Sequence, residues 1–140
     1  MQTGSLWVVQ AAQGDAEAQY NLGRMHRFGQ GGPEDFAEAR RLFGLAAAQG
    51  HTVAQSTLGS MHRDGKGGPE DYAEARRLLR LASEKCDRVA QFMLGTMHRD
   101  GQGGPQDFAE VRRLYGLAAA QGLAVAQAKL GCTYYCLLYT

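Results

Sequence analysis

The chain repeats itself with a step of 36 residues, and this period constrains its fold more than any other feature. Several positions hold the same residue type in each copy. They include the glycines Gly23, Gly59, Gly95 and Gly131, the histidines His26, His62 and His98, and the prolines Pro33, Pro69 and Pro105. All three prolines lie in the same short sequence, G-x-G-G-P-[EQ]-D. A period of this length is typical of helical hairpins that bury their apolar faces by stacking on one another.

Each unit is expected to form two helices joined by a glycine- and proline-rich loop. In the first unit, helix A is predicted from Asp15 to Arg27 and helix B from Asp35 to Gln49. The segment 29–33 separates them because Gly and Pro are unfavourable inside helices. Asp35 with Glu38 three residues later predicts a capping box, in which each residue caps the other's backbone N–H.

The expected ends of helices B share a position that favours glycine. Gly14, Gly50 and Gly122 occupy this position in three copies, whereas Cys86 occupies it in the fourth. Glycine ends helices there because it adopts the left-handed conformation without steric cost. The pattern therefore predicts a left-handed Cys86, at a cost of about 1 kcal/mol.

The whole chain is predicted to be one repeat array over residues 1–140. Complete units are expected at about 15–50, 51–86 and 87–122, with partial units at 5–14 and 123–140. The expected fold is all-α: a right-handed α-solenoid of antiparallel helix–turn–helix repeats with about seven helices, the N-terminal half-unit counted among them. The repeat register stops after Gly131, and the apolar segment 133–140 is unrelated to it. We therefore expect a fragment of a longer array, or a chain that associates end to end through its C-terminus.

Composition argues against several classes of partner. Lys and Arg total 15 and Asp and Glu total 14, so the net charge of +1 supplies no basic surplus for nucleic acid. No apolar run reaches the length of about 20 residues that a membrane-spanning helix needs. The apolar run 6–9 lacks the basic residues and cleavage site of a signal peptide. The three cysteines are irregularly spaced, which favours a reducing, cytoplasmic environment over a disulfide framework.

No metal, cofactor or catalytic group is predicted. Histidines on successive hairpins would lie about 10 Å apart, too far to share a zinc ion with bonds of about 2 Å. Cys132 and Cys136 share a helix face, but no second pair of ligands is close in sequence. No Ser–His–Asp set or carboxylate pair stands apart from the repeat, so catalysis is not expected.

Paired arginines recur in helix B beside a glutamate. Arg40 and Arg41 follow Glu38, and the same arrangement returns in the next two units. We interpret these residues as a solvated surface with weak ion pairs between positions i and i+3. The alternative is a basic stripe that binds an acidic peptide.

Helix A carries the candidate binding residues. Five positions differ most among the three otherwise similar units, and their spacing places them on one side of helix A, opposite the constant residues. They are Glu17, Tyr20, Asn21, Arg24, Phe28, Val53, Ser56, Thr57, Ser60, Asp64, Val89, Phe92, Met93, Thr96 and Asp100. Aromatic residues and Met are common in contact surfaces, so this stripe is predicted to line a protein-binding groove. The alternative is unselected drift on a solvated face.

The units resemble the Sel-1-like repeat family, a relative of the tetratricopeptide repeats. The resemblance lies in the segment A-x-x-x-L-G-x-x-H-x-x-G-x-G-G-P-x-D-[FY]-A-E-A-R-R-L-[FL]-x-L-A-A-A-Q-G and extends over about residues 6–134. The sequence departs from the family pattern at His26 and Leu42, where the family has tyrosine and tryptophan.

This resemblance implies an adaptor that binds a protein or peptide. A cysteine-rich branch of the family is linked to β-lactam hydrolysis, but here the cysteines do not follow the repeat. A hydrolase of that type, and a passive spacer in a multidomain chain, remain the alternatives.

Overall fold

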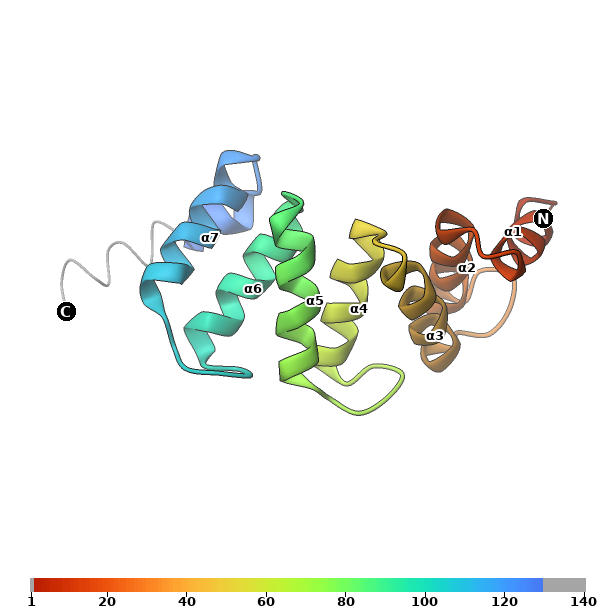
Figure 1. Ribbon diagram of the computed structural model, residues 1–140, viewed down its shortest axis with the longest axis horizontal. Coiled ribbons are helices and arrows are strands. Elements are labelled where there is room, and N and C mark those ends of the chain that lie inside the picture. The colour runs from red at the N-terminus through yellow and green to blue at the C-terminus, as the bar shows by residue number, and fades with distance from the viewer. Residues whose placement is uncertain (1, 130–140) are drawn as a thin grey trace. The chain divides into compact units, whose positions relative to one another are not determined.

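The computed structural model describes residues 2–129, with side chains from residue 5 onward. It contains the helices α1 (Gln2–Ala12), α2 (Ala16–Phe28), α3 (Phe36–Ala48), α4 (Thr52–Asp64), α5 (Tyr72–Glu84), α6 (Arg88–Asp100) and α7 (Phe108–Ala120) (Figure 1). Residues 124–129 are helical as well, and no strand occurs within residues 2–129. The predicted all-α fold of alternating helices A and B is therefore confirmed, while the handedness of the superhelix stays a prediction.

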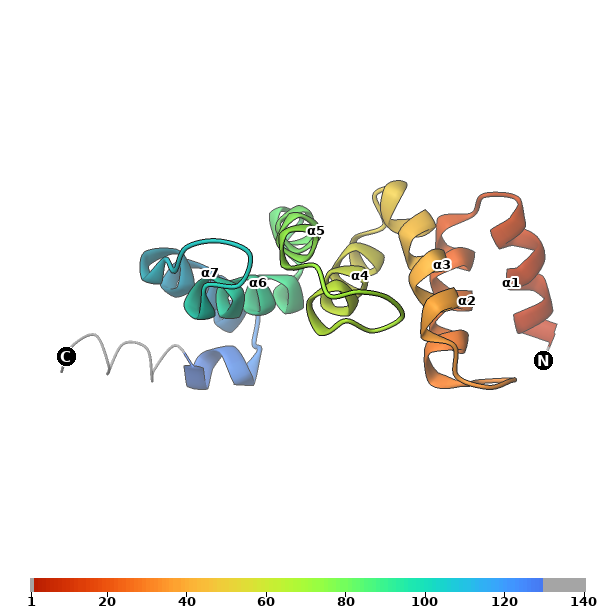
Figure 2. The ribbon, with the colours of Figure 1, turned by 90° about the horizontal axis from the view of Figure 1, so that it is seen from below.

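The chain divides into two compact units, Met1–Asp71 and Tyr72–Thr140. In the N-terminal unit α1 packs on α2, α2 on α3 and α3 on α4 (Figures 1 and 2). In the C-terminal unit α5 packs on α6 and α6 on α7. Each unit thus contains at least one complete junction between a helix B and the hairpin that follows it.

Helix starts are fixed by side-chain caps, as the sequence predicts. The Oδ1 atom of Asp35 accepts a hydrogen bond of 3.0 Å from the backbone N–H of Glu38. The other half of the predicted capping box is wrong, because the Asp35 N–H instead donates to the carbonyl of His26. The Glu38 carboxylate is therefore free to bind Arg41.

The expected left-handed position is also confirmed. Cys86 has φ 67°, and the equivalent Gly14, Gly50 and Gly122 have φ 92°, 86° and 84°. Cys86 is the one residue other than glycine with positive φ in the described chain. Repeat geometry thus forces this cysteine into a conformation that disfavours a β-carbon.

Glycine in helix A allows an aromatic ring of helix B to pack against it. A β-carbon built on Gly23 would lie 2.8 Å from the ring of Phe43, and one on Gly95 would lie 2.7 Å from the ring of Tyr115. Both rings are completely buried. The L-G pair of the repeat is therefore a packing requirement.

Buried glutamines tie successive helices together. The side-chain amide of Gln19 donates to the carbonyl of Ala11, and that of Gln55 donates to the carbonyl of Ala47, both at 3.2 Å. Because Ala11 and Ala47 stand one repeat apart, this match identifies α1 as the remnant of a helix B.

Candidate functional site

The predicted stripe is divided between exposed and packed side chains. The exposed members are Glu17, Arg24, Phe28, Val53, Asp64, Val89 and Asp100. The half-buried members are Tyr20, Asn21, Thr57, Ser60, Phe92 and Thr96. Ser56 and Met93 are buried, with 4% and 9% of their surface exposed, so they present no side chain to a partner. The first and last of the five positions are exposed in all three repeats, and the fourth position is exposed only in the first repeat, as Arg24.

Tyr20 lies at the junction between α2, α3 and the start of α4. Its ring packs on Phe43, with centroids 5.6 Å apart, and stacks on His51 at 4.7 Å. The Nε2 atom of His51 lies 2.7 Å from a carboxylate oxygen of Glu17, and Nδ1 accepts the N–H of Ala54. His51 therefore caps α4 and also connects the stripe residues Glu17 and Tyr20 to the start of that helix.

Phe92 takes the same place in the C-terminal unit. Its ring stacks on Tyr115 with centroids 5.3 Å apart. The hydroxyl of Tyr115 lies 2.8 Å from the Oγ1 atom of Thr96. In the first repeat the helix B ring is Phe43, which has no hydroxyl, and Arg24 stands where Thr96 does. Part of the variation along the stripe thus follows the residue opposite it in helix B.

Exposed valines at one repeat position remain after the packed members are removed. Val53, Val89 and Val125 stand at one position of three successive helices A, with 44%, 46% and 51% of their surface exposed. Phe28 adds an exposed ring at the end of α2, beneath the guanidinium of Arg27. Val125 was not among the predicted residues, although its register makes it equivalent to Val53.

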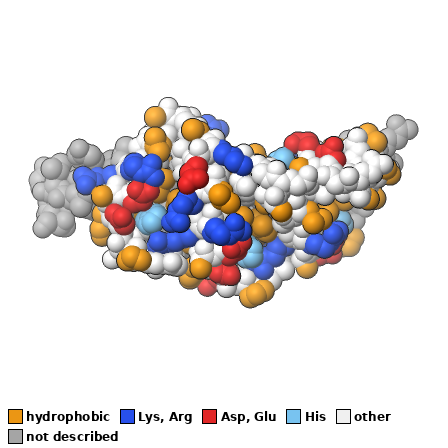
Figure 3. Space-filling view, viewed as in Figure 1, with side chains coloured by type: hydrophobic (Ala, Val, Ile, Leu, Met, Phe, Trp, Pro, Cys, Tyr) orange, Lys and Arg blue, Asp and Glu red, His pale blue; other side chains and the backbone are white. Residues whose placement is uncertain are grey.

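The glutamate–arginine pairs are ion pairs on helix B, as predicted. Arg41 binds Glu38, Arg77 binds Glu74 and Arg113 binds Glu110, each across i and i+3. The hydrogen bond from Arg41 lowers the pKa of Glu38. Figure 3 shows that acidic and basic side chains are intermixed on the surface over α5 to α7.

The first arginine of the first two pairs has a different role, which the sequence reasoning missed. Arg40 donates through Nη2 to the carbonyls of Pro69 at 2.9 Å and Met61 at 3.3 Å. The first contact joins a helix B to the loop of the next repeat, and the second joins it to helix A of that repeat. We call the arrangement the arginine clasp. The arginine–arginine motif therefore combines one surface ion pair with one inter-repeat contact.

A second clasp lies in the C-terminal unit. There Arg76 donates to the carbonyls of Gln102, Met97 and Pro105. Burial of Arg76, followed by repulsion from Arg80, lowers the pKa of its guanidinium.

The loop glycines make room for the clasp. A β-carbon on Gly68 would lie 2.0 Å from Nη1 of Arg40, and one on Gly104 would lie 2.7 Å from Nη1 of Arg76. The G-G-P sequence could have indicated the arginine clasp, because two glycines before a proline leave space for a neighbouring side chain.

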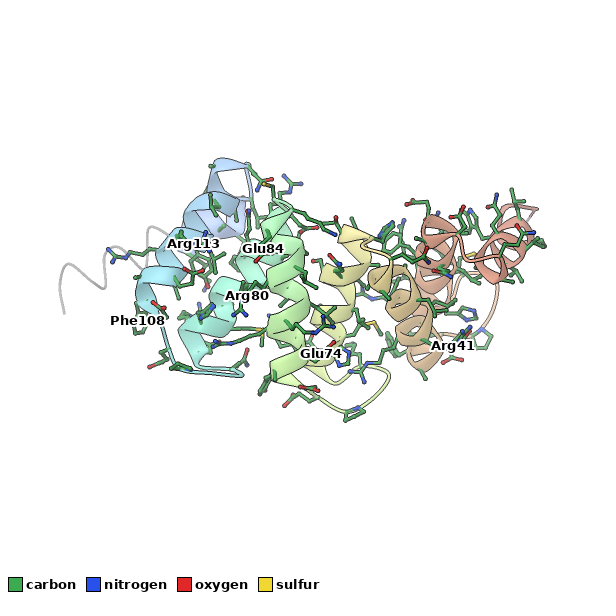
Figure 4. All side chains as sticks on the ribbon, in the orientation of Figure 1. Arg41, Glu74, Arg80, Glu84, Phe108 and Arg113 are labelled. Carbon is green, nitrogen blue, oxygen red and sulfur yellow. The ribbon has the colours of Figure 1, made fainter. Side chains whose placement is uncertain are left out.

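His98 is packed beside the second clasp. Burial lowers the pKa of His98, and the positive charge of Arg76 lowers it further, against the opposite effect of Glu110. Its Nδ1 atom is buried without a hydrogen-bond partner in the described part of the chain. Arg80 projects from α5 toward α6, and Arg113 lies on α7 (Figure 4). Burial and the positive charges of Arg76 and Arg80 together favour the neutral form of the His98 imidazole.

The described residues contain no group of three or more side chains suited to hold a metal ion. Cys86 is an exposed free thiol. Cys132 and Cys136, together with the apolar segment 133–140, lie outside the described residues. Within residues 2–129, no helix combines the length and the apolar character needed to cross a bilayer.

The stacked hairpins, capped helices and inter-repeat contacts define a helical-repeat protein. The profile of the Sel1 repeat matches residues 16–51, 52–85, 88–123 and 124–139. The chain therefore belongs to the Sel1 repeat family, as its sequence resemblance predicts. Comparison with curated proteins gave no match.

Two solved structures share this fold. One is a protective antigen present in uropathogenic Escherichia coli strains, described as displaying an SLR fold, with a TM-score of 0.89 and 34% identity over 91% of this chain. The other is a Sel1 repeat protein from Oxalobacter formigenes, with a TM-score of 0.87 and 30% identity over 94% of this chain. The chain spans 27% of the first protein and 54% of the second.

Proposed function

We propose that this chain is a protein-interaction scaffold that binds a peptide or a partner's helix along the outer positions of its helices A. Sel1 repeat proteins generally act as protein–protein interaction scaffolds. The observation that carries the proposal for this chain is the exposed valine at one repeat position, which is Val89 and Val125 in the C-terminal unit and Val53 in the N-terminal unit. Exposed apolar residues repeated at one position suit an apolar stripe of a partner.

Charged neighbours would give such a surface its specificity. Glu17 and Arg24 flank the half-buried ring of Tyr20 on α2, and Asp64 and Asp100 end the stripe on α4 and α6. Apolar centres rimmed by charged groups are typical of recognition surfaces. At the first and last positions the first repeat carries Glu17 and Phe28, whereas the other two carry valine and aspartate, so the first repeat would contact a different part of a partner.

The test uses peptides of defined sequence selected from a random display library against the intact chain. Val53→Asp with Val89→Asp places one charge at this valine position in each unit and should weaken binding of the selected peptides at least tenfold. Leu45→Asp with Leu117→Asp is the matched control, because these leucines are exposed to a similar degree, 43% and 41%, on helices B. Circular dichroism verifies that both variants fold.

Loss of binding only in the valine variant supports the proposal. Equal loss in both variants, or unchanged binding in the valine variant, would place the interaction elsewhere and overturn it.

A further inference from the structure

Of the three hairpin loops within residues 2–129, one lacks an arginine clasp. In the register that the glutamine contacts establish, the position of Arg40 and Arg76 falls in α1 on Gly4. The first loop therefore has the carbonyls that accept an arginine elsewhere, but no arginine on the preceding helix. A β-carbon built on Gly32 meets nothing within 4 Å, whereas one on the equivalent Gly68 would collide with Arg40.

An open hollow lies where the missing side chain would be. Its lining includes Val8, Leu22, Met25, Gln30, Pro33 and Asp35. Its loop residues are the equivalents of those that hold the guanidinium of Arg76 in the third repeat. The hollow lies entirely within the N-terminal unit and on the side of α2 away from the variable stripe.

The chemistry of the hollow matches a guanidinium group. The carbonyls of Met25, Gln30 and Pro33 correspond to the three acceptors of Arg76, and a planar group with several donors can reach them together. Val8 and Leu22 offer apolar surface to the methylene stem of an arginine. Asp35 adds a carboxylate at the rim, which favours a cation.

We propose that this hollow is a binding site for an arginine side chain presented by a partner protein or peptide. The partner's guanidinium takes the place that Arg40 and Arg76 hold in the other two loops. The site is independent of the proposed valine surface, so either can fail without the other.

The test titrates N-acetyl-arginine amide into the isotopically labelled intact chain and follows backbone amides by NMR. Binding of a single side chain is expected to be weak, with Kd on the order of 1–10 mM. The amides of Gln30, Gly31 and Gly32 should shift and saturate. Those of the equivalent Gly67, Gly68, Gly103 and Gly104 should not, because their loops already hold an arginine. N-acetyl-citrulline amide, the neutral isostere, should bind at least tenfold more weakly.

Matched variants of Gly4 test the location. Gly4→Arg supplies the missing residue, so it should fill the hollow and weaken the probe at least tenfold. Gly4→Ala controls for the change in helix propensity and should bind the probe as the original chain does. Arg40→Gly should open a second site, with new saturating shifts at Gly67 and Gly68.

Three outcomes overturn the proposal: no saturating shift of residues 30–32 up to about 50 mM probe, equal shifts in all three loops, or undiminished binding to Gly4→Arg. If Arg40→Gly fails to fold, the two Gly4 variants still decide the matter.

Discussion

The Nη2 atom of Arg40 lies 2.9 Å from the carbonyl oxygen of Pro69, so a helix of one repeat is bound directly to the loop of the next. Its neighbour Arg41 forms only a surface pair with Glu38. Two adjacent arginines of one motif thus have separate structural roles.

Replacement of these two residues should have unequal effects on stability. Arg40→Ala removes a charged donor from one loop carbonyl and one helix carbonyl and should lower the free energy of unfolding by about 1–3 kcal/mol. Arg41→Ala removes an exposed ion pair and should cost less than about 1 kcal/mol. Urea denaturation followed by circular dichroism measures both. Equal losses would show that the clasp contributes no more than the surface pair.

The left-handed Cys86 predicts a stabilising substitution. Cys86→Gly should raise the free energy of unfolding by about 1 kcal/mol, because glycine adopts positive φ without steric cost. Gly50→Ala at the equivalent position should lower it by about the same amount. Thermal denaturation under reducing conditions compares the three proteins. A destabilised Cys86→Gly would mean that the thiol contributes more by packing than its backbone costs.

The burial of His98 predicts a loss of stability in acid. Its folded pKa is lowered, so below its ordinary pKa of about 6.5 the unfolded chain binds more protons at this site. The contribution of His98 to the free energy of unfolding is fully present above pH 6.5 and declines as the pH falls toward the folded pKa. NMR titration of the imidazole should give a midpoint below 6.5, and His98→Asn should reduce the pH dependence of the melting temperature. A midpoint at or above 6.5 would contradict the assignment.

Local chemistry made most of the fold predictable from sequence. Asp15 and Asp35 cap their helices, and Gly29 ends α2 with φ 66°, because these effects act within a few residues of the chain. Because these residues recur every 36 positions, the helix boundaries predicted for one hairpin also apply to the others.

Contacts between repeats were less predictable. Arg40 and Arg41 are adjacent residues of the same type. Their roles differ because Arg40 contacts the loop of the next repeat, whereas Arg41 contacts Glu38 on its own helix. Ser56 and Met93 vary as surface residues do, yet both are buried. Variation between repeats therefore reports packing against helix B as well as exposure to partners.

The close contact between Gly95 and Tyr115 gives the last prediction. Gly95→Ala would place its β-carbon 2.7 Å from the buried ring, so the ring or helix must move, and we expect a loss of about 1–3 kcal/mol in unfolding free energy. Gly116→Ala is the matched control, because a β-carbon there meets nothing within 4 Å and alanine favours the helix by about 0.5–1 kcal/mol. Tyr115→Leu in the Gly95→Ala background should recover part of the loss, since leucine occupies this helix B position in the middle repeat as Leu79. A double-mutant cycle of urea denaturation measures the coupling between the two sites. If Gly95→Ala and Gly116→Ala change stability alike, or if the cycle shows no coupling, the glycine serves some purpose other than admitting the ring.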